Sequence, residues 1–298
     1  MSESVRVLFS NLWFPVKTGV VKGCIFIEKG RIGFIGEHPE PEHELSELQY
    51  DFQGYAMALH GFSTIVDVVE YPLRRLRVGD LSVLSRDELK TVAEVGLINA
   101  VSNGITMPII HSDHSEAAVE AARELGVPLI VIHGGEARVH GGIHSFTLRN
   151  GRLYVDDKPL GPLDDVLCSP LSTRSTCRIM DLRSAGSTPQ PLAILHSAGV
   201  DAARLYRILT EPYRLIGAGE GYVDRGETAD LQVVDLRNPV KASIIRGEED
   251  FWSTASRFTS PDLVLIHGEV VYEKGEYLIK PLRSITGILG KLANRLSP

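Results

Sequence analysis

The sequence of 298 residues contains few cysteines, namely Cys24, Cys168 and Cys177. Three thiols at scattered positions are too few for a disulfide framework or for a thiolate zinc site. Reduced thiols are the expected state in a cytosolic protein, although Cys168 and Cys177 could pair. Cys24 lies in an apolar strand pattern, so we expect it to be a small buried side chain.

The sequence also lacks long apolar runs and an excess of basic residues. No apolar run approaches the ~20 residues that cross a bilayer, and the start, MSESVRVLFSNLWF, has no basic segment followed by a cleavage site. We therefore expect no membrane span and a cytoplasmic location. The 31 Lys and Arg residues and 38 Asp and Glu residues give a net charge of -7. A general nucleic-acid binder needs clustered cations to displace counterions from phosphates, so no nucleic-acid partner is expected.

Two common catalytic signatures are missing as well. The glycine-rich stretch IHGGEARVHGGIH has no Gly-Lys-Ser/Thr ending, so it does not match a phosphate-binding loop. No Ser-His-Asp order or nucleophile elbow is present, so a serine nucleophile is not predicted. The run SPLSTRSTCR has hydroxyls and arginines that could hold an anion, but an exposed loop is the simpler interpretation.

Both ends of the chain have β patterns. In the first block, VRVLF precedes GVVKGCIFIEKGRIGFIGE, in which EKGR separates two apolar runs as a hairpin turn does. In the last block, ADLQVVDL precedes DLVLIHGEVVYEKGEYLI, in which Gly268 and Gly275 mark two more turns. Each block is too small to bury both faces of its own sheet. We therefore expect a composite β-sandwich domain made from residues 1–58 and 225–282.

The segment between these blocks, residues 59–224, has the pattern of a parallel α/β core. GFSTIVDVVEY is a nearly continuous β-branched run, which is typical of a parallel strand covered on both faces. Ser85 and Glu88 have capping-box spacing and predict a helix that stops near Asn103-Gly104. The strand ITMPII, the helix SEAAVEAARELG and the strand VPLIVIH follow. This alternation favours a right-handed parallel sheet.

The alternation stops after His133. FTLRNGRLYV predicts a hairpin with its turn at Asn150-Gly151. The stretch to about Pro191 is rich in Ser, Thr and Pro and has no clear period, and PLAILH is a further candidate strand. AGVDAARLYRILTEPYRLIG predicts a helix that is interrupted or ends near Pro212, because proline lacks the backbone donor that a helix interior needs.

The last residues, 283–298, are expected to form an amphipathic helix. Its apolar face contains Leu282, Ile285, Ile288, Leu289 and Leu292. A basic amphipathic helix can contact a membrane or a partner. The more common arrangement is packing on its own domain or across a dimer, which we expect here.

Several segments resemble the amidohydrolase superfamily. GCIFIEKGRIGFIGE resembles the opening hairpin of that family, and PDLVLIHGEVVYEKGEY resembles its closing hairpin. LTEPYRLIGAGEGYVDRGETADLQVVDL resembles the family's late helix, glycine turn and Ala-Asp-Leu strand. The ending looks most like dihydroorotases and hydantoinases, which process cyclic amides. The resemblance implies a barrel-like α/β core and hydrolysis of C–N bonds, with zinc as the metal if the protein is active.

The sequence departs from this family at the first core strand. The family pattern is Pro-Gly-Phe-Val-Asp-x-His-x-His, whose two histidines hold the metal. Here the stretch is HGFSTIVDVV, in which Gly61 and Phe62 match but Val66 and Val68 stand at the histidine positions. A valine has no lone pair to offer a cation, so this half of the site cannot bind zinc as the family does.

The core is also short. A full barrel of eight strand–helix units takes ~250 residues, and the segment between about Leu59 and Arg225 is far smaller. The expected fold is therefore a truncated TIM-barrel-like parallel α/β core plus a β-sandwich from both chain ends. No late-strand Asp of the kind that serves the family as ligand and base is evident. Asp201 is the closest, but it fits a helix start.

Imidazoles and carboxylates follow the second and third core strands, where parallel folds bind ligands. His111, His114 and His133 could supply three metal ligands and leave one position open for water. Asp113 or Glu136 would then carry the proton to the leaving group. The alternative is that these residues lie in loops and cap helices, because short polar residues around a helix start commonly do so.

Three functions remain open. The first is a C–N hydrolase with a remodelled metal site, and its substrate would be a small amide. The second is a pseudoenzyme that binds a partner protein or a metabolite without turnover, alone or as a homo-oligomer. The third is a small-ligand binder that uses the loops rich in glycine and histidine. The lost ligand pair favours the second, whereas the histidine cluster favours the first.

Overall fold

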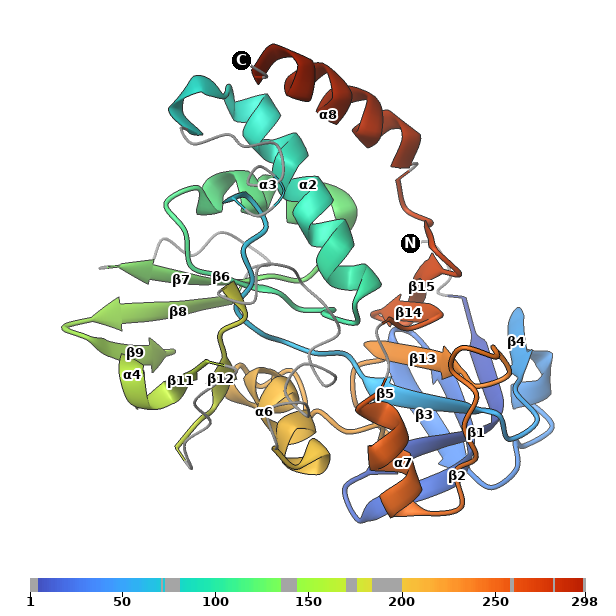
Figure 1. Cartoon of the computed structure of the whole chain (residues 1–298). Helices are drawn as coiled ribbons and strands as arrows, with labels where there is room; N and C mark the ends of the chain where they lie inside the picture. Colours follow the sequence, from blue (N-terminus) through green and yellow to red (C-terminus); the bar gives the residue numbers. More distant parts are fainter. Residues whose placement is uncertain are drawn as a thin grey trace.

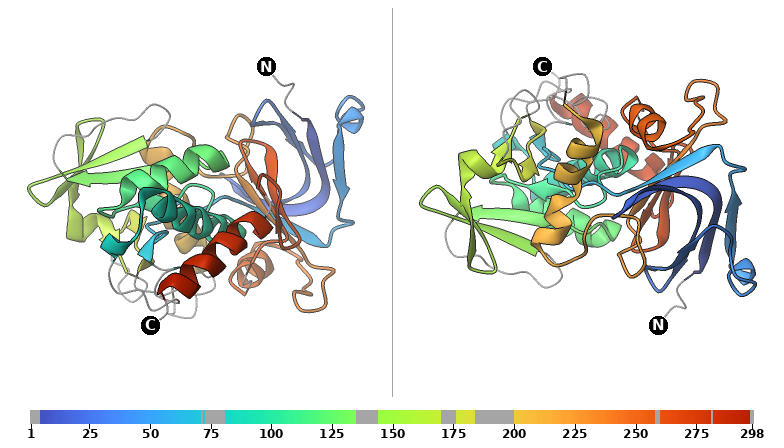
Figure 2. Two further views of the ribbon diagram at one scale, coloured as in Figure 1. Left: turned by 90° about the horizontal axis from the view of Figure 1, so that it is seen from above. Right: turned by 90° about the horizontal axis from the view of Figure 1, so that it is seen from below.

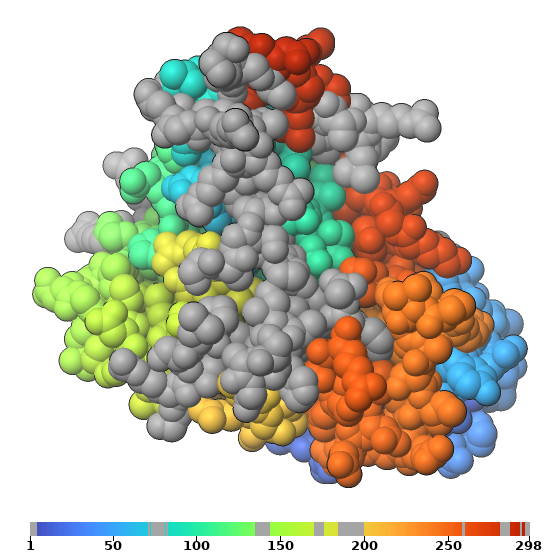
Figure 3. Space-filling view, in the orientation of Figure 1, coloured from blue at the N-terminus to red at the C-terminus, as the bar shows by residue number. Residues whose placement is uncertain are grey.

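The computed structural model describes residues 5–70, 72, 81–134, 144–169, 176–183, 200–257, 260–280 and 282–296. These residues form two parts that lie side by side, a nine-stranded sheet and an α/β part with a five-stranded sheet (Figures 1 and 2). In Figure 3 the nine-stranded sheet, in blue and orange, lies at the lower right and the C-terminal helix, in red, lies at the top. The fold is mixed α/β, and the described residues contain no closed barrel.

Strands from both chain ends share the nine-stranded sheet. The order along its main path is β16-β15-β14-β13-β5-β1-β2-β3, and β4 pairs with β1. Antiparallel pairing of β5 with β13 joins the two ends, from Ala56–Asp235 to His60–Leu231. The two ends thus form one hydrogen-bonded sheet, and the sandwich domain stays a prediction. The strands are β1 (Val7–Val16), β2 (Gly19–Glu28), β3 (Arg31–Gly36), β4 (Leu48–Asp51), β5 (Ala56–His60), β13 (Leu231–Asp235), β14 (Leu263–Ile266), β15 (Glu269–Glu273) and β16 (Glu276–Tyr277).

The turn between β2 and β3 is the predicted hairpin. Glu28 pairs with Arg31, and the two residues between them have positive φ, 51° at Lys29 and 76° at Gly30. This backbone suits a two-residue hairpin turn with the twist of the strands. A Cβ at Gly30 would lie 3.0 Å from the carbonyl oxygen of His267. Glycine is therefore needed here both for its φ and for the close approach of the C-terminal hairpin.

Parallel segments form the centre of the α/β part. Strands β6 (Ile109–Ile110), β7 (Ile130–Gly134) and β8 (His144–Arg149) are parallel neighbours. The segment 61–66 lies beside β6, since Ile109 N donates to Thr64 O at 2.9 Å, and Val66 N donates to Ile109 O at 3.1 Å. On its other side, Ile65 N donates to Met180 O at 2.8 Å. That places β12 (Ile179–Met180), which pairs in parallel with β11 (Leu167–Cys168), next to segment 61–66.

The predicted core elements are largely confirmed. The hairpin of β8 with β9 (Arg152–Val155) turns at Asn150-Gly151 and is extended by the antiparallel strand β10 (Lys158–Pro162). The capping box is present, because the Ser85 N–H donates to Glu88 Oε2 at 2.8 Å and the Glu88 N–H donates to Ser85 Oγ at 3.3 Å. PLAILH lies outside the described residues.

The helices are η1 (His43–Leu45), η2 (Leu81–Val83), α2 (Arg86–Ser102), α3 (Ser115–Leu125), α4 (Leu163–Val166), α6 (Ala202–Leu215), α7 (Glu248–Ala255) and α8 (Leu282–Leu296).

Of the two predicted alternatives at Pro212, helix α6 ends near the proline and is not interrupted at it. It continues through the proline and ends three residues later, at Leu215. Proline removes one backbone donor, but so close to the helix end few further hydrogen bonds depend on it, and Pro212 O still accepts from Ile216 N at 3.2 Å. The buried face of α6, with Tyr206 and Leu209 fully covered, stabilises the helix through packing.

The C-terminal helix packs back on its own chain. In α8, Leu292 is 3% exposed and packs with Val92 of α2 and with Leu84. An ion pair of 2.7 Å joins Arg295 to Glu88, the same residue that completes the capping box of α2. Packing on its own domain, the expected arrangement, is thus confirmed for α8 (Figure 1). No described helix has the length and apolar character to cross a membrane.

The cysteine expectations have a mixed outcome. Cys24 is buried, as predicted. Cys168 and Cys177 form a disulfide with their Cα atoms 5.6 Å apart, which corrects the expectation of reduced thiols and suits disulfide geometry. The parallel pairing of Cys168 with Met180 brings the start of β12 back beside β11. Spacing in the sequence alone did not reveal that pairing.

Candidate active site

A cavity of about 530 Å³ lies at the carboxyl ends of the parallel segments. Segment 61–66, β6 and β12 contribute the residues that follow them: Asp67 and Glu70 follow segment 61–66, His111 follows β6, and Asp181 and Arg183 follow β12. Ser112 and Ser169 add hydroxyl groups to the lining. Ligands of parallel α/β folds bind at this end of the strands. The cavity is therefore the candidate active site.

Apolar side chains form the wall of the cavity next to segment 61–66. Val66 and Val68 line the cavity and are only 1% and 2% exposed, because they also belong to the main hydrophobic core. The two positions that the motif resemblance aligned with the family's His-x-His pair therefore hold buried aliphatic side chains. Neither side chain can coordinate a cation.

The structure brings an ion pair to the cavity that sequence reasoning missed. Asp181 accepts from Arg183 at both carboxylate oxygens, with Nη2 to Oδ2 at 2.6 Å and Nε to Oδ1 at 3.0 Å. Arg183 Nη1 also donates to the carbonyl oxygen of His111 at 3.3 Å. The guanidinium thus connects the end of β12 with the end of β6.

Asp181 is an aspartate at a strand end that lines the cavity and that the sequence did not make evident. It follows a strand of two residues inside the stretch without a period, so only the short apolar run Ile179–Met180 before an acid could have indicated it. Asp201, the closest candidate in the sequence, is confirmed as a helix start. Its Oδ1 accepts from the Arg204 N–H at 2.8 Å and caps α6.

His111 is the predicted site residue that lines the cavity. Burial lowers the pKa of His111, and the positive charge of Arg183 lowers it further, against the opposing charges of Asp181 and Asp113. Its Nδ1 atom is buried and has no hydrogen-bond partner among the described residues. The imidazole is therefore neutral near pH 7 and has one unused nitrogen facing the protein interior.

The other predicted site residues lie elsewhere. Asp113 is exposed, and His114 is the N-cap residue of α3, where its backbone N–H donates to Ser112 Oγ at 3.1 Å. His133 is half-buried near the end of β7. None of these three is among the residues that line the cavity. Glu136 lies outside the described residues.

Within the described ranges, one group of three possible metal ligands has its donor atoms within 4.8 Å of one another, namely Glu40, Glu42 and His43. It is remote from the cavity in the chain, and its histidine is unsuited to ligation. The Glu40 N–H donates to His43 Nδ1 at 3.2 Å, so the neutral ring carries its proton on Nε2. The ring is also packed against Phe26 and Phe34, with centroids at 4.3 and 4.6 Å.

The described residues therefore do not fit the three-ligand zinc centre of a metal hydrolase. Val66 and Val68 offer no ligand atom, and the carboxylate of Asp181 is held by Arg183. His111, His114 and His133 do not form such a group among the described residues. Their role as ligands stays a prediction, for which the structure supplies His111 at the cavity.

Comparisons with known proteins agree on the fold. No protein-family model matches the sequence, and no curated protein matches it. Among solved structures, a triazine hydrolase from Arthobacter aurescens is 12% identical, with a TM-score of 0.70 over 99% of this chain and 100% of that chain. An adenosine deaminase from Xanthomonas campestris with bound zinc is 12% identical, with a TM-score of 0.68 over 98% of both chains. An amidohydrolase from a Sargasso Sea sample is 13% identical, with a TM-score of 0.65 over 98% of both chains. The chain therefore shares the overall fold of these three solved hydrolase and deaminase structures.

Proposed function

We propose that the protein is a hydrolase that acts on C–N bonds of small cyclic or linear amides at the cavity beyond the parallel strands. The observation that carries the proposal is a neutral imidazole, His111, beside a fixed guanidinium, Arg183, in a cavity of small-molecule size. The shared fold supports it, because the similar structures include a mutant atrazine chlorohydrolase complexed with zinc and atraton, and an adenosine deaminase with bound zinc. The closing hairpin favours cyclic amides of the dihydroorotase and hydantoinase type.

The proposed reaction uses groups of this chain. His111 takes a proton from water at Nε2, because Nδ1 is buried, while the water oxygen attacks the carbonyl carbon. Arg183 stabilises the negative charge that develops on the carbonyl oxygen. The C–N bond then breaks, and the leaving nitrogen receives the proton. The protonated imidazole of His111 returns this proton to the leaving nitrogen. Of the carriers expected from the sequence, Asp113 or Glu136, Asp113 is exposed and does not line the cavity, and it acts on His111 through its charge.

A panel of cyclic amides, linear amides and ring-substituted triazines tests this proposal. With an active substrate, His111→Gln should lower kcat/KM by about 100-fold or more, because general base catalysis contributes that much. The matched control is His38→Gln, since His38 is exposed on the nine-stranded sheet side of the chain. Equal activity of the His111→Gln and His38→Gln proteins would refute the assigned base.

The pH dependence of kcat/KM gives a second prediction. The base must be neutral, and the pKa of His111 is lowered from its ordinary value of 6.5 by burial and by Arg183. Activity should therefore persist at pH 6.5 and fall only as the pH drops through the lowered pKa. A profile measured between pH 4 and pH 8, corrected for unfolding, checks this. If kcat/KM falls on the acid side with a midpoint above pH 6.5, the assignment of His111 as the base is contradicted.

A second candidate function is binding of a metabolite without turnover. It is favoured by Val66 and Val68, which replace two ligands, and by the engagement of Asp181 with Arg183. Thermal-shift measurements with the same panel distinguish the two functions. A compound that stabilises the protein but yields no product, even after long incubation, favours binding alone.

A further inference from the structure

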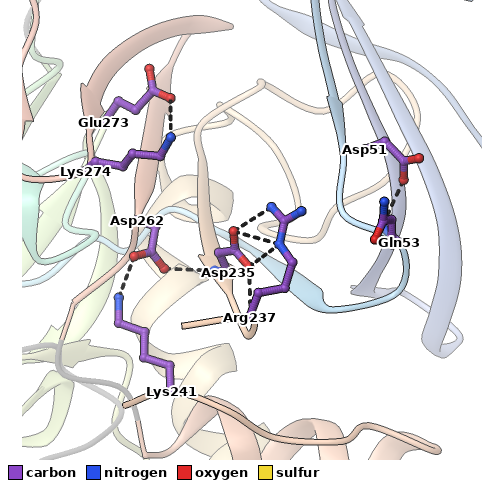
Figure 4. Close-up of polar contacts among 8 residues, drawn as sticks. All are labelled: Asp51, Gln53, Asp235, Arg237, Lys241, Asp262, Glu273 and Lys274. Atoms are coloured by element: carbon purple, nitrogen blue, oxygen red, sulfur yellow. Dashed lines mark hydrogen bonds and ion pairs between the residues drawn. The ribbon is translucent and has the colours of Figure 1, made fainter. Parts of the chain in front are cut away.

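The Asp181–Arg183 pair has the same geometry as a second pair outside the cavity. Asp-Leu-Arg follows β12 at 181–183, and a second Asp-Leu-Arg, at 235–237, begins on the last residue of β13. In both, the arginine backbone N–H donates to the aspartate Oδ1, at 3.0 and 2.9 Å, and Nη2 donates to Oδ2 at 2.6 Å. Figure 4 shows the second pair, Asp235 with Arg237. The arrangement is therefore set by the local sequence at a strand end and needs no ligand.

The two Asp–Arg pairs differ in their surroundings. Asp235 and Arg237 lie at the partly exposed end of β13 in the nine-stranded sheet. Asp181 and Arg183 line the cavity, where β12 is the neighbour of segment 61–66. Within the cavity, both carboxylate oxygens of Asp181 are thus occupied before any ligand enters.

Arg183 is also the one Lys or Arg among the described residues that line the cavity. Asp67, Glu70 and Asp181 line the same space, so the guanidinium balances part of a negative field. Arginine keeps its charge at every physiological pH, and its planar donors match a carboxylate. It provides at this strand end a permanent positive charge that requires no metal.

We propose that Arg183 is a built-in cation that replaces a divalent metal ion in this cavity and prevents Asp181 from ligating one. Asp181 is held in a bidentate pair, Val66 and Val68 of the neighbouring segment have no atom that could ligate a cation, and the guanidinium repels a second cation. The cavity is therefore metal-independent. This inference concerns metal binding and holds whether or not the cavity turns over a substrate, so it can fail without affecting the proposed hydrolysis.

Equilibrium dialysis of the full chain against ZnCl₂ and MnCl₂, with elemental analysis, tests the inference. The wild-type protein should hold no zinc that depends on Asp181, so Asp181→Asn should leave its zinc content unchanged. Arg183→Ala should bind zinc at Asp181 at least about 10-fold more tightly than the wild type, because the repulsion between the guanidinium and the metal ion is removed. The double variant Arg183→Ala/Asp181→Asn should lose that gain.

Arg237→Ala is the matched control, since it breaks the same motif outside the cavity and should not create the site. Any zinc bound at Glu40, Glu42 and His43 would be present in the same amount in all of these proteins, so it does not affect the difference in zinc content between them. If Arg183→Ala does not fold, as judged by circular dichroism, Arg183→Gln removes the charge and keeps donors. A wild-type protein with one zinc per chain that is lost on Asp181→Asn or on His111→Ala overturns the inference. Unchanged zinc affinity in the folded Arg183 variant also overturns it.

Discussion

Gly96→Ala should destabilise the protein by about 3 kcal/mol. Gly96 lies in α2, where the helix passes directly over the backbone of Val68. An added Cβ would contact the Val68 carbonyl oxygen and would lie 2.5 Å from its Cα and 2.6 Å from its carbonyl carbon. Because these atoms belong to the backbone, no side-chain rotation can relieve the overlap. Urea unfolding followed by circular dichroism measures the change.

The matched control is Gly290→Ala in α8. Gly290 is also helical, but a Cβ there meets nothing within 4 Å. That change should be neutral or stabilising by up to about 1 kcal/mol, because alanine has the higher helix propensity. Val66–Glu70 line the cavity, so Gly96→Ala should also weaken ligand binding, whereas Gly290→Ala should not. Equal unfolding free energies for the two variants would contradict the close approach of α2 to the backbone of Val68.

Lys280→Met should cost about 3 kcal/mol of unfolding free energy. Lys280 Nζ lies 2.8 Å from Glu94 Oε1, and the Glu94 side chain is only 4% exposed. Removing the cation leaves a buried carboxylate without that partner, which typically costs about 3–5 kcal/mol. We place the loss at the lower end because the Lys280 side chain is 27% exposed, so water can reach the vacated space.

This ion pair connects the two parts of the molecule. Glu94 is on α2, and Lys280 follows β16 of the nine-stranded sheet. The matched control is Lys274→Met, whose pair with Glu273 spans 3.9 Å with the lysine 82% exposed (Figure 4), and which should change stability by less than about 0.5 kcal/mol. Lys280→Met/Glu94→Gln should recover part of the loss, since no buried charge remains. No recovery in the double variant would indicate that lost packing, rather than charge, explains the effect.

Much of the fold was predictable because its signals are local. The capping box at Ser85 and Glu88 defines the start of α2, and Asn150-Gly151, with φ of 49° and 71°, defines the β8–β9 turn. These patterns act over two to four residues, where propensity and hydrogen bonding are readable. The passage of α6 through Pro212 was not predictable, because burial of its apolar face decides it.

The candidate site was predictable only in part. His111 was identified because it follows an apolar strand at the end where parallel folds bind ligands. Asp181 and Arg183 were missed, because a two-residue strand has no readable period. The Cys168–Cys177 disulfide was only an alternative in the sequence, because it depends on the pairing of β11 with β12.

The sequence by itself determined that two valines stand at the metal-ligand positions of the resembled family, and that both chain ends carry the paired β patterns. Those are properties of residue type and short-range order, which need no coordinates. Only the tertiary structure decided that β12 lies beside segment 61–66 and that Arg183 reaches both Asp181 and the carbonyl of His111, 72 residues earlier in the chain. The physical reason is that strand order and cavity lining arise from backbone hydrogen bonds between distant segments, and residue spacing carries no record of them.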